Sequence, residues 1–162
     1  MPSTPGNCAY YLEVSFNQRD IQLYKQCLSP NFTFLFNPSD VGTEADGYVI
    51  PEAWGYEDDW TAMQNMFNEA YDISFAIAEN DIGDPEEGAT TYLAEDIPIN
   101  LLVMIDTENG FLAQGACDFT FDTYESNGDT YWRIRNWRDG TAVKTTEPAS
   151  LGKIKAYFAK KR

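Results

Sequence analysis

Residues 126–140, SNGDTYWRIRNWRDG, decide the fold. An Asn-Gly pair between two alternating runs is the strongest short-range signal of a β-hairpin, so we predict a turn at Asn127 and Gly128. Alternation then divides the following strand into two faces. The first face contains Trp132, Ile134 and Asn136, and the second contains Tyr131, Arg133, Arg135 and Trp137. We predict that the first face packs against a core and that the second is half-exposed or forms an interface.

The length and composition predict one domain with a β-rich core. The chain has 162 residues, enough to bury a single sizeable core. Its 10 Phe, 10 Tyr and 4 Trp are a heavy aromatic content for one domain. Aromatic side chains bury large areas in fixed geometries and favour strands, so they indicate a β-rich interior that surrounds a cavity or fills one.

The charge excludes some partners. The net charge of -15 repels phosphate backbones and anionic membrane surfaces, so neither nucleic acid nor membrane is an expected partner. The longest apolar run, residues 97–105, is far too short to span a bilayer. The first seven residues lack the basic and apolar regions of a signal peptide. We therefore expect a cytoplasmic protein if Met1 is the native start, and an exported one if a leader has been removed.

The residue types restrict the possible chemistry. The chain contains no histidine, which excludes Ser-His-Asp and Cys-His arrangements and removes the commonest metal ligand. Cys8, Cys27 and Cys117 form no CxxC pair and are odd in number, so neither a zinc site nor a disulfide framework is indicated. We predict three buried thiols, no metal site and no cofactor.

Periodicity along the chain predicts helices followed by strands. The helical segments are residues 8–20, 21–28 and 56–69, with a short basic helix within 147–162. The strands are 32–36, 71–78, 90–106, 111–124 and 131–140, and the strand at 90–106 is predicted to be broken near residues 96–98. A long loop at 37–55 separates the first strand from the third helix, and loops of this length commonly form lids or walls of sites.

Four short motifs, in their order and spacing, resemble the NTF2-like (SnoaL-like) superfamily. They are QRDI at 18–21, LSPNFTF at 28–34, WRI at 132–134 and WRD at 137–139. The resemblance covers residues 8–140 and implies an α+β fold, a cone-shaped curved antiparallel sheet wrapped around three N-terminal helices. On this basis we expect a disordered segment at 1–7, an NTF2-like domain at 8–147 and a C-terminal helical tail at 148–162.

The resemblance also implies a cavity between the concave face of the sheet and the helices. Ten residues map onto its lining: Tyr11, Phe34, Trp54, Trp60, Met63, Phe67, Cys117, Phe119, Trp132 and Asn136. A mostly apolar pocket with a few polar groups is the usual site for a small molecule. The leading hypothesis is therefore a protein that binds a small hydrophobic molecule in an aromatic-lined cavity. A filled core is the structural alternative.

The positions of this chain that match the known catalytic residues of the superfamily do not carry the residue types that those reactions need. The base of isomerase-like members falls near Phe36 and Asn37, and their protonated acid falls near Cys117. Dehydratase-like members rely on histidine, which is absent. An epoxide-hydrolase-like Asp-Arg-Asp set would use Arg133 or Arg135 with a nearby aspartate, but cross-strand ion pairs explain the same residues more simply.

Two further hypotheses stay open. One is a histidine-free lyase, isomerase or hydrolase with an Asp or Glu general base; Asp46, Glu52 and Glu57 lie in or beside the long loop. The other is an interaction module that forms a homodimer through the outer sheet face carrying Tyr131, Arg133, Arg135 and Trp137. Solvent exposure and helix capping explain most other carboxylates, including Asp58 and Asp59.

Overall fold

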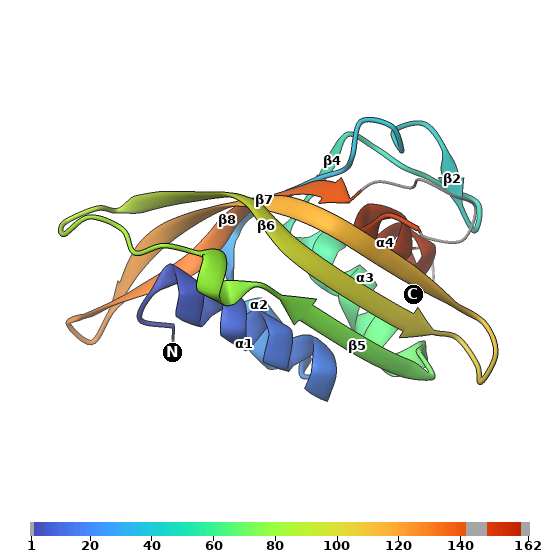
Figure 1. Ribbon diagram of the computed structural model, residues 1–162, viewed down its shortest axis with the longest axis horizontal. Helices are drawn as coiled ribbons and strands as arrows, with labels where there is room; N and C mark the ends of the chain where they lie inside the picture. The colour runs from blue at the N-terminus through green and yellow to red at the C-terminus, as the bar shows by residue number, and fades with distance from the viewer. Residues whose placement is uncertain (1, 142–148, 160–162) are drawn as a thin grey trace.

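A computed structural model describes residues 2–141 and 149–159. In this part of the chain, two helices, four strands and a third helix come first, and four antiparallel strands and a last helix follow (Figure 1). The helices are α1 (Pro5–Gln18), α2 (Ile21–Gln26), α3 (Tyr56–Glu69), the 3-10 turn η1 (Glu79–Asp81) and α4 (Leu151–Ala159). The strands are β1 (Leu28–Leu35), β2 (Glu44–Ala45), β3 (Tyr48–Val49), β4 (Ala53–Gly55), β5 (Asp72–Ile77), β6 (Thr91–Met104), β7 (Gly110–Ser126) and β8 (Asp129–Thr141).

One curved sheet and the helices on its inner side form the domain. Six of the described strands run in the order β4-β1-β8-β7-β6-β5; β1 pairs with β8 in parallel, and the other neighbours in this order are antiparallel. Helices α1, α3 and α4 lie against the sheet's concave side (Figure 1). The α+β cone expected from the sequence is confirmed.

The β7–β8 hairpin has the turn that its sequence predicts. Asn127 and Gly128 have φ values of 53° and 84°, and both positive values are required by the type I′ turn that joins two twisted strands. Ser126 pairs with Asp129 on either side of the turn. The inward face of β7 carries Ala113, Cys117, Phe119 and Phe121, which are all buried.

A β-bulge interrupts the same pair of strands. Thr120 pairs with Asn136 while the next residue, Phe121, pairs with Ile134, so Arg135 has no partner across the ladder. An extra residue on one strand reverses the alternation of faces beyond it. The face of β8 that points inward therefore changes at this position.

The bulge makes one sequence prediction wrong. Trp137, predicted on the outer face, is completely buried, and its ring packs 5.7 Å from the Phe34 centroid and 5.1 Å from the Phe119 centroid. Trp132 and Ile134 are buried as predicted, while Asn136 is only half-buried. Strict alternation fails here because a bulge cannot be seen in the residues of a single strand.

Both ends of the predicted domain also differ. The segment 1–7 was expected to be disordered, but α1 begins at Pro5, capped by the Thr4 hydroxyl, which accepts a hydrogen bond from the Asn7 backbone N–H at 3.0 Å. Thr4 is a favourable N-cap, and proline is tolerated at the start of a helix. The C-terminal segment forms α4, which is largely buried in the core rather than a tail. Residues 142–148 and 160–162, which include part of the predicted tail, lie outside the described residues.

The junction between α2 and β1 is shifted as well. The helix predicted at 21–28 ends at Gln26, and the strand predicted at 32–36 begins at Leu28. Pro30 therefore lies inside β1. Its missing amide is accommodated because the pairing of β1 with β8 is irregular between Leu28 and Thr33, and bulges are where strands admit proline.

Side chains of α1 cover the backbone of the edge strand β5. The Asn17 amide donates to the Phe75 carbonyl at 2.9 Å and accepts from the Phe75 N–H at 2.8 Å. The Glu13 carboxylate accepts from the Ile77 N–H at 2.9 Å. An uncovered edge offers unpaired N–H and C=O groups to other chains, so these two side chains protect the sheet from association through β5.

We expect Asn17→Ala to weaken this protection. The substitution removes two hydrogen bonds at a partly exposed site and should lower the free energy of unfolding by about 1–2 kcal/mol. It should also increase aggregation on heating, because the Phe75 backbone becomes available for pairing. Urea unfolding and light scattering measure the two effects. Gln18→Ala, at the exposed neighbouring position, is the control and should change neither.

Candidate functional site

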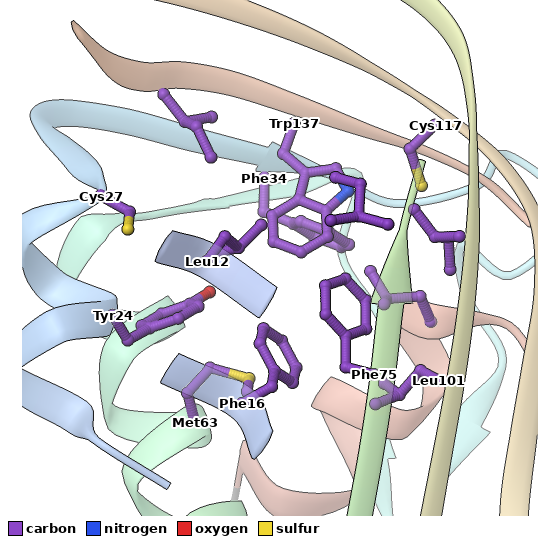
Figure 2. Close-up of a cluster of buried hydrophobic side chains, with 14 of the residues drawn as sticks. Leu12, Phe16, Tyr24, Cys27, Phe34, Met63, Phe75, Leu101, Cys117 and Trp137 are labelled. Carbon is purple, nitrogen blue, oxygen red and sulfur yellow. The ribbon is translucent and has the colours of Figure 1, made fainter. Parts of the chain in front are cut away.

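The residues predicted to line a cavity lie mostly in a packed interior. Figure 2 shows the buried cluster, in which Phe34, Met63, Cys117 and Trp137 converge with side chains of α1, α2 and β5. Seven of the ten predicted residues are buried: Phe34, Trp54, Met63, Phe67, Cys117, Phe119 and Trp132. Tyr11, Trp60 and Asn136 are half-buried. Their role in ligand binding stays a prediction.

The structure brings some of these residues together and separates others. The Phe34 and Trp54 rings lie 6.5 Å apart, and Phe67 packs with Phe16 at 5.8 Å. Trp132 instead borders a separate hollow beside the loop at 85–90. Trp60 lies under the Lys25 ammonium, 4.0 Å from its ring centroid. Trp132 and Trp60 therefore have neighbours other than the Phe34–Trp54 and Phe67–Phe16 ring pairs.

Helix α4 supplies the segment that fills the space between the helices and the sheet. Leu151, Ile154, Ala156 and Phe158 are buried, and the Asn65 amide of α3 donates to the Phe158 carbonyl at 2.9 Å. Lys155, from the same helix, is also completely buried. The interior expected to be a cavity thus contains part of the chain itself.

Lys155 meets Asp59 in a buried polar network. The Lys155 Nζ lies 2.7 Å from Asp59 Oδ1 and 3.1 Å from the Tyr24 hydroxyl. The Trp54 Nε1–H donates to Asp59 Oδ1 at 2.9 Å, and the Tyr24 hydroxyl donates to Asp59 Oδ2 in a short hydrogen bond. Each Asp59 oxygen is therefore satisfied, as a buried carboxylate requires. Four elements, α2, β4, α3 and α4, contribute one side chain each.

Burial opposes the charged forms in this network. It lowers the pKa of Lys155 from its usual 10.5, while the neighbouring Asp59 carboxylate acts in the opposite direction. Burial also raises the pKa of Tyr24 well above 10.0, and the negative charge of Asp59 adds to this. Asp59 and Lys155 are both completely buried. The carboxylate consequently has no route to a solvent-borne substrate in this conformation.

This network was not among the sequence-based predictions. Asp59 was assigned to a solvent-facing helix end, and neither Tyr24 nor Lys155 was singled out. One signal was available: Lys155 lies four residues after Leu151, one after Ile154 and three before Phe158, inside the apolar stripe of a helix. A charged residue within such a stripe indicates a buried partner. The identity of the partner, 96 residues away in sequence, follows only from the fold.

A second polar cluster holds the N-terminal end of α4. Asp139 accepts hydrogen bonds from the Gly152 N–H at 2.8 Å and from the Thr141 N–H at 2.9 Å. The Ser150 hydroxyl donates to Asp40 in a short hydrogen bond. Burial raises the pKa of Asp139 above 3.8, partly offset by these donors. The helix is thus fixed at its start by β8 and at its centre by Asp59.

A hollow remains on the outer side of α4. It has a volume of about 370 Å³ and lies between the β2–β3 hairpin, the start of β7 and α4. The Phe111 and Tyr157 rings, 4.9 Å apart, form its aromatic wall. Its lining residues are Glu44, Ala45, Asp46, Phe111, Ala149, Lys153 and Tyr157. None of them was among the ten predicted, because the hollow is created by packing between segments distant in sequence.

The three cysteines are buried thiols, as predicted. Burial raises the pKa of Cys117 to about 12, and the nearby Asp139 carboxylate acts in the same direction. Burial likewise raises the pKa of Cys8 well above 9.0. Thiols in this state are poor nucleophiles at neutral pH. Within residues 2–141 and 149–159, no group of three Cys, Asp or Glu residues is placed to hold a metal ion, and no helix is long and apolar enough to cross a membrane.

The outer sheet face carries the cross-strand ion pair anticipated from the sequence. Arg135 and Asp122 lie 3.3 Å apart and are both partly exposed. Arg133 stacks over Tyr124, 3.6 Å from its ring centroid. Trp137 is missing from this face, so the surface predicted for a homodimer is reduced to Tyr131, Arg133 and Arg135. The homodimer itself stays a prediction.

Comparisons with known proteins give structural matches alone. No protein-family model matches the chain, and no curated protein matches it. A conserved protein from Planctomyces limnophilus is 12% identical, covers 83% of this chain and 91% of its own, and has a TM-score of 0.62. An NTF2-like protein of unknown function in nutrient uptake from Rhodospirillum rubrum is 7% identical, with coverages of 84% and 96% and a TM-score of 0.58.

An enzyme is also among the matches. The hexachlorocyclohexane dehydrochlorinase LinA-type3 from Novosphingobium barchaimii is 8% identical, covers 85% of this chain and 84% of its own, and has a TM-score of 0.53. Identities this low establish the architecture and leave activity open. The sheet order, the helices on the concave face and these matches together show that the chain has an NTF2-like fold.

Proposed function

We propose that this domain binds a small hydrophobic molecule in the hollow beside α4. The observation that carries the proposal is the hollow of about 370 Å³ with its Phe111–Tyr157 aromatic wall. Small-molecule sites commonly span about 300–1,000 Å³ and combine apolar walls with a few polar groups. Here Ala45 and Ala149 extend the apolar surface, and Lys153 lies at its border.

The charge of the protein restricts the ligand. A net charge of -15 repels anions over long distances, and Glu44 and Asp46 add local negative charge to the hollow. A neutral or weakly cationic aromatic compound fits these surroundings better than a carboxylate or phosphate. Helix α4 lies between the two regions: Lys153 and Tyr157 line the hollow, and Ile154 and Phe158 are buried in the aromatic interior that was predicted as the binding site.

The catalytic alternative has weaker support. A general base must reach the proton that it removes, either directly or through one water. Asp59 is an interior carboxylate beside a tyrosine, but Lys155, Trp54 and Tyr24 occupy its oxygens and its side chain is completely buried. Access would require α4 to leave the core. Binding without chemistry is therefore the function that we propose.

Filling the hollow tests the proposal. We expect the wild-type protein to bind a neutral solvatochromic dye, Nile red, with saturable fluorescence enhancement. Ala45→Trp should place an indole in the hollow and weaken binding about tenfold or more, equivalent to ~1.4 kcal/mol. Val49→Trp is the matched control, because Val49 belongs to the same hairpin, is 59% exposed and lies outside the lining.

Thermal unfolding of all three proteins shows whether the variants are folded. Weakened binding in Ala45→Trp with unchanged binding in Val49→Trp supports the hollow as the site. Equal binding by the three proteins would place the dye elsewhere and contradict the proposal. An absence of saturable binding to the wild type would contradict it as well.

A further inference from the structure

The Lys155 ammonium lies in a cage built from aromatic faces and one carboxylate. Its Nζ is 4.1 Å from the Phe34 ring centroid and 4.2 Å from that of Trp137. The Tyr24 and Phe32 rings are more distant, at 5.8 Å and 5.9 Å. Aromatic faces attract cations through the ring quadrupole, most strongly where water is excluded. All the surrounding rings are buried, so the cage meets that condition.

The polar partners of the ammonium form a preorganised acceptor set. Asp59 accepts from Lys155 at 2.7 Å, and the Tyr24 oxygen accepts from it at 3.1 Å. Trp54 and Tyr24 donate to the same carboxylate and fix its orientation independently of Lys155. Because these donors come from β4 and α2, the acceptor set does not depend on α4 for its geometry.

Such surroundings are complementary to an organic cation rather than to lysine alone. An isolated buried ion pair is a weak source of stability, because desolvation offsets the attraction between the charges. Here the cation has a carboxylate, a hydroxyl oxygen and two aromatic faces within reach, the chemistry used by proteins that bind amine ligands. Lys155 supplies the matching ligand from α4, an ammonium on an unbranched four-carbon stem.

We propose that the interior of the cone is a binding site for a primary alkylammonium group, which this chain fills in cis with Lys155. The ligand class is an unbranched alkylamine of about the length of the lysine stem. A quaternary ammonium is excluded, because N–H groups are needed for Asp59 and Tyr24. This site is separate from the hollow on the outer side of α4 and does not depend on ligand binding there.

Removing the lysine side chain from the full-length protein tests the site. Lys155→Ala should lower the Tm of the protein and leave a cavity beside Asp59. We expect n-propylammonium, which replaces the three carbons and the nitrogen removed beyond Cβ, to restore the Tm at millimolar concentrations in a saturable manner. 1-Propanol, which has the same length and no charge, should require a concentration about tenfold higher for the same restoration. Tetramethylammonium should restore nothing. Wild-type protein should respond to none of these compounds.

Two controls separate cation recognition from filling of a cavity. The double variant Lys155→Ala/Asp59→Asn should lose the preference for propylammonium over propanol, because the amide carries no charge. Lys155→Met, which keeps most of the stem in place, should not respond to propylammonium. If Lys155→Ala alone is unfolded, propylammonium should recover its near-ultraviolet circular dichroism where propanol does not.

Three results would overturn the proposal. Equal restoration by propanol would reduce the site to an apolar cavity. A preference for propylammonium that survives in the Asp59→Asn background would remove the carboxylate from recognition. Failure of propylammonium to change either the Tm or the folding of Lys155→Ala would show that the cage holds lysine only through its attachment to α4.

Discussion

Replacing Asp59 by alanine should lower the free energy of unfolding by about 3–5 kcal/mol. The substitution leaves the Lys155 ammonium completely buried without its carboxylate, 2.7 Å away in the native protein. It also removes the acceptor of the Trp54 and Tyr24 hydrogen bonds. An uncompensated buried charge is among the most destabilising single changes a core can carry. Unfolding in urea measures the effect, because urea is uncharged and does not screen interactions between charges as guanidinium chloride does.

Asp58→Ala is the matched control. Asp58 lies in the same first turn of α3 but is exposed, so its loss should cost only the weak helix-dipole term of about 0.3–1 kcal/mol. A double variant, Asp59→Ala/Lys155→Met, should recover part of the loss because no buried charge is left unpaired. Similar losses for Asp58→Ala and Asp59→Ala would contradict the buried network. So would a double variant less stable than the sum of its single changes.

Trp137→Ala should destabilise the protein by about 3–5 kcal/mol, the usual cost of deleting a large core aromatic. Trp137 is completely buried, and its ring contacts Phe34, Phe119 and the Lys155 ammonium. Tyr131→Ala, on the same strand before the bulge, should cost about 1 kcal/mol or less because Tyr131 is partly exposed. Strict alternation along β8 places these two residues on one face and predicts equal effects.

The comparison therefore tests the bulge at Arg135. Chemical unfolding of the two variants, with fluorescence and circular dichroism as independent probes, gives the free energies. A large difference between them supports the reversal of faces seen in the structure. Comparable small losses would place Trp137 on the outer face and restore it to the surface predicted for a homodimer.

Local sequence signals predicted the elements but not all of their faces. The Asn127-Gly128 turn was correct because both residues adopt positive φ easily, and the bounds of α3 were correct because its apolar stripe is unambiguous. The face of Trp137 was wrong, because the register between β7 and β8 sets it. The order of elements and the motifs at 18–21, 28–34 and 132–139 were enough to predict the NTF2-like cone.

The polar network and the hollow beside α4 were not predictable from local sequence signals. Asp59, Tyr24, Trp54 and Lys155 come from four elements, and no spacing along the chain relates them. The hollow beside α4 likewise arises from the hairpin, β7 and α4 packing against one another. The family resemblance implied a cavity between the sheet and the helices, and the last helix was predicted as a tail, whereas α4 packs in this interior.

The sequence by itself determined the α+β architecture, the hairpin order, the buried thiols and the net charge of -15. These properties depend on local conformational preference, periodicity and composition, which follow directly from the order and identity of the residues. The tertiary structure alone decided that α4 enters the cone, that Lys155 meets Asp59, and that Trp137 turns inward. Each of these depends on contacts between segments far apart in the chain. The extra residue of the bulge and the packing of α4 against the sheet change which side chains are in contact.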